Sequence, residues 1–256
     1  MIKAKRANAC AVVNGGLTCW GLNAEGLLAN GNTNNTLSPN VVFSGGNGVT
    51  DFAINVNFSS NLTASICAVI NGGVKCWGKN NYGELGLGTT SPFELNPVNV
   101  INSGEGVTKV DGSYGGWCGI KNGGLICWGN NSNGVLGKSA LGANTPTIVV
   151  SEGSGVTDLM FGDEVTCIII NGGLKCWGLN HSGSVGNSTI EASYKPVEIF
   201  PAGSNVQEVV EVNQAYGYSI CARVDNSLKC WGSNYLGVIP TGQVNNGILR
   251  VHGNGY

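Results

Sequence analysis

The chain has 256 residues, a formal net charge of −2 and 11% charged residues, less than half the roughly 25% typical of soluble domains. The weak charge disfavours a nucleic-acid-binding protein, which needs a clustered basic surface. No apolar run reaches the length of a membrane span. We therefore expect a folded chain with a neutral polar surface, no bound nucleic acid and no segment inserted in a membrane.

The first ten residues, MIKAKRANAC, lack the apolar core of a signal peptide. A chain that is exported would need such a signal. We expect that it was removed, or that this sequence is one domain of a longer exported protein.

Five copies of one pattern then follow, each with two cysteines nine positions apart. In the second copy, CAVINGGVKC, the pair Asn71-Gly72 is typical of a two-residue type I′ turn between antiparallel strands. The resulting register places Cys67 opposite Cys76 in a non-hydrogen-bonded pair. Such pairs bring the two Cα atoms to about 4.5 Å, within the range of a disulfide.

The cysteine spacing excludes the competing kinds of site. Zinc sites need Cys-x2–4-Cys pairs and redox motifs need Cys-x-x-Cys, whereas eight residues separate these cysteines. We therefore expect five disulfides and an oxidising compartment, which means a secreted or cell-surface protein. The pairs are Cys10–Cys19, Cys67–Cys76, Cys118–Cys127, Cys167–Cys176 and Cys221–Cys230.

The remainder of each copy predicts two further strands. After the second cysteine comes Trp-Gly-x-Asn-x-x-Gly, then a β-branched run that proline opens, then a second apolar stretch such as GVTKV at 106–110. Four short strands per unit of 49–57 residues, without helical periodicity, are typical of β-propeller blades. We expect the repeated tryptophans to pack between blades.

The two ends of the chain predict how the ring closes. Residues 247–251, GILRV, match the stretch that precedes each cysteine hairpin, but no hairpin follows them. The hairpin at Cys10 has no such stretch before it. We therefore expect one all-β propeller domain over residues 1–256, monomeric by itself. Its five four-stranded blades would be closed by a clasp of one C-terminal strand and three N-terminal ones.

The repeat resembles that of a known family. The pattern Cys-Ala-x-x-x-Gly-x-x-x-Cys-Trp-Gly-x-Asn-x-x-Gly-x-Leu-Gly at 67–86 is similar to the repeat of the regulator of chromosome condensation family, in its disulfide-bearing bacterial form. The resemblance covers essentially the whole chain. It implies a β-propeller, usually of seven blades, that works as a protein-binding surface and not as an enzyme. Five copies are a departure from that number.

Catalytic and metal-binding motifs do not emerge from the sequence. His181 replaces Ala24, Asn81, Ser132 and Tyr235 of the other copies, and His252 has no evident partner. Asp163-Glu164 lacks the spaced ligand set of a calcium site. We expect no enzyme activity, no cofactor and no metal.

The segments before each cysteine hairpin differ most between copies. Strand order places them on one face of the propeller, and a rigid scaffold with variable aromatic loops is typical of binding surfaces. The alternative is that these aromatic residues only cap the central channel. The candidate binding residues are Phe58, Tyr114, Trp117, Asp163, Glu164, Tyr216, Tyr218 and Tyr256.

We therefore expect a non-catalytic binding module for a macromolecule, most of all a protein. A carbohydrate-binding tip of an adhesin is the alternative, because aromatic residues with Asn and Asp also suit sugars. An enzyme with a site in the channel is the least favoured hypothesis.

Overall fold

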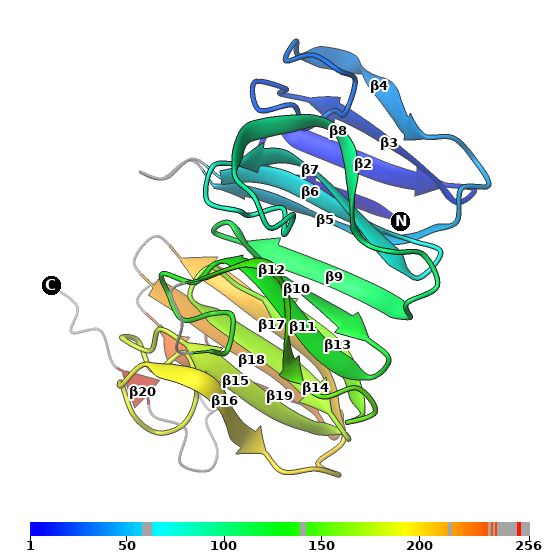
Figure 1. The fold of residues 1–256 in the computed structure, drawn as a ribbon. Helices are drawn as coiled ribbons and strands as arrows, with labels where there is room; N and C mark the ends of the chain where they lie inside the picture. The colour runs from blue at the N-terminus through cyan, green and yellow to red at the C-terminus, as the bar shows by residue number, and fades with distance from the viewer. Residues whose placement is uncertain are drawn as a thin grey trace, which may run out of the picture. The chain divides into compact units, whose positions relative to one another are not determined.

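The computed structural model describes residues 1–57, 63–138, 142–214, 217–234, 237, 239 and 250–251. In this part of the chain the regular elements are all strands, arranged in five four-stranded sheets (Figure 1). The chain divides into two compact units, Met1–Asn130 with Gly142–Glu152 and Asn131–Leu141 with Gly153–Tyr256. Within the same described ranges, no helix is long and apolar enough to cross a membrane.

The first unit contains three sheets, in each of which the four antiparallel strands follow one another in chain order. The first sheet consists of β1 (Ile2–Lys5), β2 (Asn8–Val13), β3 (Gly16–Gly21) and β4 (Thr36–Phe43). The second consists of β5 (Val49–Asn57), β6 (Thr63–Ile70), β7 (Gly73–Asn80) and β8 (Ser91–Ile101). The third consists of β9 (Val107–Ser113), β10 (Gly116–Lys121), β11 (Gly124–Asn130) and β12 (Gly142–Val150).

The second unit contains two sheets. The fourth sheet consists of β13 (Val156–Phe161), β14 (Val165–Ile170), β15 (Gly173–Gly178) and β16 (Ser193–Phe200). The fifth consists of β17 (Val206–Gln214), β18 (Gly217–Val224), β19 (Ser227–Ser233) and β20 (Arg250–Val251). In this last sheet β20 runs parallel to β19, whereas the other pairs are antiparallel.

The predicted cysteine hairpins are confirmed. Asn71 and Gly72 have φ of 48° and 74°, as the turn between β6 and β7 requires. The register pairs Cys67 with Cys76 and Val69 with Val74. All five predicted disulfides form, each with a Cα–Cα distance of 4.1 Å. Five such bonds indicate an oxidising environment.

Thiol chemistry tests these bonds directly. Protein produced in an oxidising compartment and unfolded without reductant should show no free cysteine when labelled with a maleimide. The same protein labelled after reduction should take up ten labels, which is the matched control. Stoichiometric labelling before reduction would contradict the five disulfides.

The Trp-Gly motif explains how neighbouring sheets of one unit pack. Trp77 and Trp231 are buried, and their Nε1 atoms donate to the carbonyls of Leu27 at 2.8 Å and Ser184 at 2.9 Å. Each acceptor lies in the Trp-Gly turn of the preceding copy. The expected packing of the repeated tryptophans between sheets is therefore confirmed for these sheets.

The glycine after each tryptophan is required by close backbone approach. In the five copies its φ lies between +92° and +129°. A Cβ there would lie 2.0–2.5 Å from a carbonyl oxygen at the start of the neighbouring strand. Only glycine fits such a position.

The asparagine of the motif organises the loop after it. In all five copies its Oδ1 accepts a hydrogen bond, 2.8–3.0 Å long, from the backbone N–H five residues later. The Asn180 side chain is fully buried, and its Nδ2 also donates to the carbonyls of Thr189 and Glu191. The buried side-chain amide of Asn180 therefore binds backbone groups across the loop 180–191, which contains no strand of its own.

The clasp expected from the sequence is not shown. The strand beside β2 is β1, in the register Ile2↔Ala11 to Lys5↔Asn8, and β20 pairs with β19. Lys3 on β1 forms an ion pair with Asp51 on β5 at 2.9 Å, and Asp51 Oδ2 accepts the N–H of Val110 on β9 at 3.0 Å. The fourth strand of the first sheet is therefore the N-terminal segment IKAK. The predicted clasp would have used a C-terminal strand in this place.

The variable segments before the cysteines are mostly strand and not loop. β9 and β10 are joined by Tyr114-Gly115 alone, with φ of 50° and 78°. β5 extends to residue 57 and β17 to residue 214, so the longer segments lengthen strands. Side chains from Val49 to Val56 on β5 are all buried except Thr50, which explains why the extra residues remain in the sheet.

Candidate functional site

The structure describes five of the eight predicted binding residues. Tyr114 is half-buried in the turn between β9 and β10, and its carbonyl accepts a hydrogen bond from Asn130 Nδ2 at 3.2 Å. Tyr218 is half-buried on β18, opposite Asn213. Phe58, Tyr216 and Tyr256 lie outside the described residues, as does His252.

Trp117 does not belong to an exposed surface. Its side chain on β10 is fully buried, and its Nε1 donates to Ser65 Oγ on β6 at 3.2 Å. The residues before it form a tight turn, so Trp117 lies near the start of a strand and packs in the core of the first unit. The expectation that it contacts a partner needs correction, because a fully buried side chain is not accessible.

Asp163 and Glu164 lie in the connection between β13 and β14. The backbone N–H of Asp163 donates to Glu211 Oε2 at 3.3 Å, and its carbonyl accepts a hydrogen bond from Asn133 Nδ2 at 3.0 Å. Burial raises the pKa of Glu164, while the nearby His181 opposes that shift. In the described ranges, no three His, Cys, Asp or Glu side chains are grouped so that they could hold a metal ion.

Glu84 is a buried carboxylate that the sequence did not single out. It follows Gly83 in the second copy, where other copies have Leu27, Val135 and Ser184. It is 1% exposed, and its Oε2 accepts the N–H of Tyr82 at 2.7 Å. Desolvation by burial raises its pKa above the ordinary value of 4.5.

The Glu84→Gln variant should be more stable than the wild type at pH 7 and equally stable at pH 4. A raised pKa in the folded state means that the unfolded chain ionises first as the pH rises above 4.5, so folding loses free energy there. Glutamine stays neutral and avoids this loss. Urea unfolding at both pH values measures the difference in stability, with Glu191→Gln at an exposed position as the control. A stability difference that does not change between pH 4 and pH 7 would contradict the assignment.

A groove in the first unit combines charged and apolar side chains. It has a volume of about 280 Å³ and lies where the end of β8 faces β11 and β12. Its apolar walls are Val100, Ile101, Ile126, Pro146 and Ile148, and Ile148 is 59% exposed. Its charged residues are Glu105, Lys121 and Glu152, which come from the turn before β9, the end of β10 and the turn after β12. We call these eight residues the β8–β12 groove.

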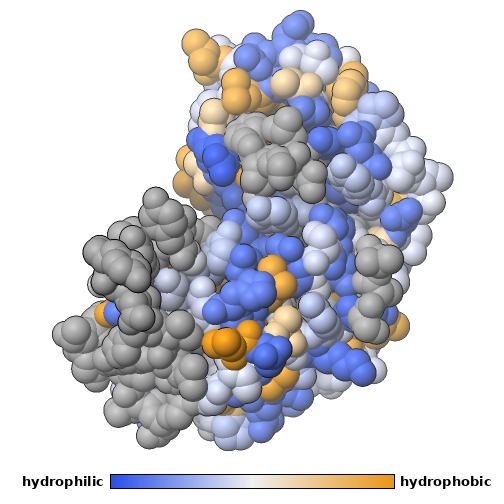
Figure 2. All heavy atoms as spheres, turned by 90° about the vertical axis from the view of Figure 1, so that its left-hand side faces the viewer, coloured by the Kyte–Doolittle hydropathy of each residue, from blue (hydrophilic) through white to orange (hydrophobic). Residues whose placement is uncertain are grey.

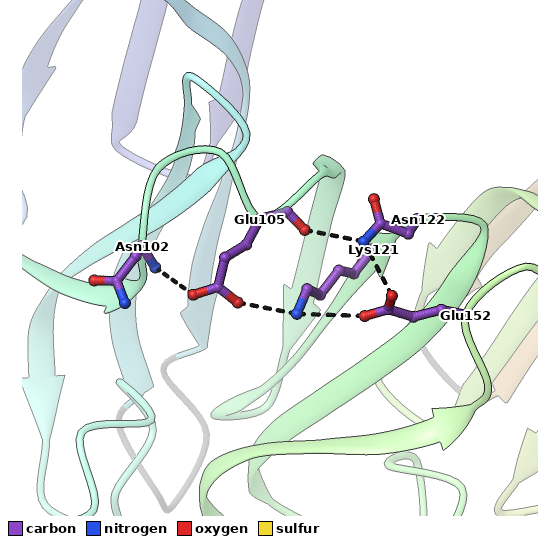
Figure 3. A network of polar contacts seen from close by, with 5 residues as sticks. All are labelled: Asn102, Glu105, Lys121, Asn122 and Glu152. Carbon is purple, nitrogen blue, oxygen red and sulfur yellow. Dashed lines mark hydrogen bonds and ion pairs between the residues drawn. The ribbon is translucent and has the colours of Figure 1, made fainter.

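The two carboxylates of the groove converge on one ammonium group, as Figure 3 shows. Lys121 Nζ lies 2.9 Å from Glu105 Oε2 and 3.3 Å from Glu152 Oε1. The other oxygen of each carboxylate accepts an N–H, from the Asn102 backbone for Glu105 and from Asn122 Nδ2 for Glu152. Three turns of the chain are therefore joined through one lysine.

These hydrogen bonds favour the ionised forms of Glu105, Glu152 and Lys121 at neutral pH. The bond from Lys121 lowers the pKa of Glu105, and the bond from Asn122, with that from Lys121, lowers the pKa of Glu152. The bond to Glu105 raises the pKa of Lys121. Two negative charges and one positive charge give a local net charge of −1.

The groove is specific to its place in the chain. In the fourth sheet the residues at the same register positions as Lys121, Ile126, Ile148 and Glu152 are Ile170, Lys175, Glu198 and Ala202. Lys175 and Glu198 form a charged cross-strand pair there, where the third sheet has two isoleucines. The corresponding hollow of the fourth sheet measures only about 80 Å³.

On the face drawn in Figure 2, hydrophobic residues form small separate patches among polar ones. Few residues of the chain are charged, so a cluster of three charges beside the exposed Ile148 is distinctive.

Comparison with known proteins identifies the fold. No protein-family model matches the chain. The crystal structure of human WBSCR16 is similar with a TM-score of 0.71 and 19% identity, over 91% of this chain and 61% of that one. Prp20p from Saccharomyces cerevisiae, reported with its binding to Gsp1p and histones, is similar with a TM-score of 0.65 and 20% identity, over 88% of this chain and 57% of Prp20p.

The chain therefore spans about 60% of the length of these two proteins. They come from human and yeast, so the bacterial form of the repeat stays a prediction. These comparisons support the β-propeller fold for the chain, and its membership of the repeat family stays a prediction.

Proposed function

We propose that the protein is a non-catalytic binding module, secreted or exposed at the cell surface, that recognises another protein. The five disulfides support an oxidising location. The similar Prp20p binds Gsp1p and histones, which supports a protein as the partner.

The observation that carries this proposal is the β8–β12 groove. Most residues of each copy are needed for the disulfide, the Trp-Gly turn and the asparagine loop. Residues that recognise a partner are therefore expected at the positions that differ between copies. The groove gathers four such positions from the third sheet and the turns beside it. An apolar patch with a polar rim is typical of protein interfaces, and here the exposed Ile148 lies beside three charged residues.

The loop surface expected from the sequence is a second place for contact. Tyr114 in the first unit and Tyr218, Asp163 and Glu164 in the second are at least partly exposed. A partner could engage them in addition to the groove, and we retain this as a proposal.

Affinity capture together with a glycan array tests the proposed function. The disulfide-bonded protein, immobilised and exposed to extracellular fractions, should capture a protein saturably, and the reduced, unfolded chain should not. The array should give no signal. Saccharide binding without any captured protein would contradict the proposal and favour a carbohydrate-binding tip.

A further inference from the structure

We infer that the β8–β12 groove binds an arginine side chain of the partner, next to an aliphatic residue in the same peptide segment. This inference rests on the proposed protein-binding function and specifies the chemistry of the partner at that site.

The charge of the groove selects a cation. Lys121 is neutralised by two carboxylates, and its side chain is only 22% exposed. Glu105 and Glu152 are 39% and 46% exposed, so water or a ligand reaches their oxygens. A carboxylate oxygen that accepts one hydrogen bond can accept a second. The local net charge of −1 attracts a positive group and repels a negative one.

The geometry favours arginine over a simple ammonium. The two carboxylates flank the Lys121 ammonium (Figure 3), and a guanidinium offers five N–H donors in a planar fork, so it can pair with both oxygens of one carboxylate from the solvent side. The groove of about 280 Å³ is large enough for one or two side chains and too small for a folded element.

The apolar walls of the groove favour an aliphatic residue next to the arginine in the partner. Ile126 and Ile148 face each other across β11 and β12, and Val100 and Ile101 border them from β8. Ile148 exposes 59% of its surface, which an aliphatic neighbour of the arginine would cover. A free amino acid or a polyamine would leave this surface in water, so a peptide segment is the better occupant.

Peptide selection tests the inference. A random heptapeptide library displayed on phage is selected on the intact protein, and the enriched peptides are synthesised and measured by calorimetry. We expect Arg beside Val, Ile or Leu. The double variant Glu105→Gln with Glu152→Gln should weaken binding of these peptides by about tenfold, as expected for two rim ion pairs.

The Lys121→Gln variant is the matched control because it changes the charge in the opposite direction. Removal of the ammonium makes the groove more negative, so arginine peptides should bind equally well or more tightly. Thermal unfolding checks that all variants fold. Enrichment of acidic peptides, peptides insensitive to the double variant, or equal weakening by Lys121→Gln would overturn the inference.

These outcomes separate the inference from the proposed function. If a captured protein binds the double variant as tightly as the wild type, the groove is not its site, but the module still binds protein. If arginine peptides bind as expected and no protein is captured, the groove chemistry stands and the proposed function fails.

Discussion

The Trp177→Ala variant should lose about 3–5 kcal/mol of unfolding free energy, the range for removing a large buried aromatic side chain. The Trp177 side chain is fully buried. Its loss would leave a cavity and the Val135 carbonyl without its 2.8 Å donor. For a chain of this size, we expect a fall in Tm of roughly 6–20 °C, measured by calorimetry.

Trp20 provides the matched control, because it occupies the same motif position in the first copy but is only half-buried. Trp20→Ala should cost less than Trp177→Ala. Equal losses for the two variants would mean that the burial of the side chain is not what the repeated tryptophans contribute to stability.

The Gly178→Ala variant should be destabilised by more than about 3 kcal/mol, a loss expected where backbone has to move. Gly178 has a φ of +129°, and an added Cβ would lie 2.0 Å from the Glu164 carbonyl oxygen. That oxygen accepts the N–H of Leu179 at 2.8 Å, so moving it also breaks a hydrogen bond. Urea unfolding measures the loss.

Gly203→Ala separates the clash from the cost of positive φ. Gly203 has a φ of +82°, and an added Cβ meets nothing within 4 Å. We expect a loss of about 1–2 kcal/mol from the left-handed backbone alone. If both variants lose the same amount, close approach to Glu164 is not the reason for glycine at position 178.

Local patterns made most of the fold predictable. The Asn-Gly turn fixes the register of each hairpin, and that register places the cysteines opposite each other at 4.1 Å. These relations involve residues within ten positions, and five copies repeat them. A register derived from one copy could therefore be checked against the other four within the sequence itself.

Relations between distant segments were not predictable in the same way. The segment DGSYGGW at 111–117 was predicted as a loop because the segments before the cysteines vary in length and content, yet its tight turn places Trp117 in the core. For the first sheet, GILRV at 247–251 was predicted as the fourth strand, and IKAK at 2–5 was not predicted to be a strand. Tertiary pairing decides between them, and it placed β1 beside β2.

The groove could not be predicted from the sequence, because its residues come from separate strands and turns. Glu105, Lys121 and Glu152 each resemble an ordinary solvated surface residue in the sequence. One signal was present. Aligned by their cysteines, the other copies have an apolar residue at the position of Lys121 and Lys or Thr at that of Ile126, so the third copy reverses the polarity of both.

An exchange of groove residues between sheets tests the central claim, that the third sheet carries the binding specificity of an otherwise common scaffold. The variant combines Lys121→Ile, Ile126→Lys, Ile148→Glu and Glu152→Ala, which places the residues of the fourth sheet at the matching positions of the third. The measurement is the affinity of this variant, by calorimetry, for the protein that the wild type captures. The account predicts an intact disulfide-bonded fold with affinity lowered at least tenfold. Unchanged affinity in a folded variant would contradict it.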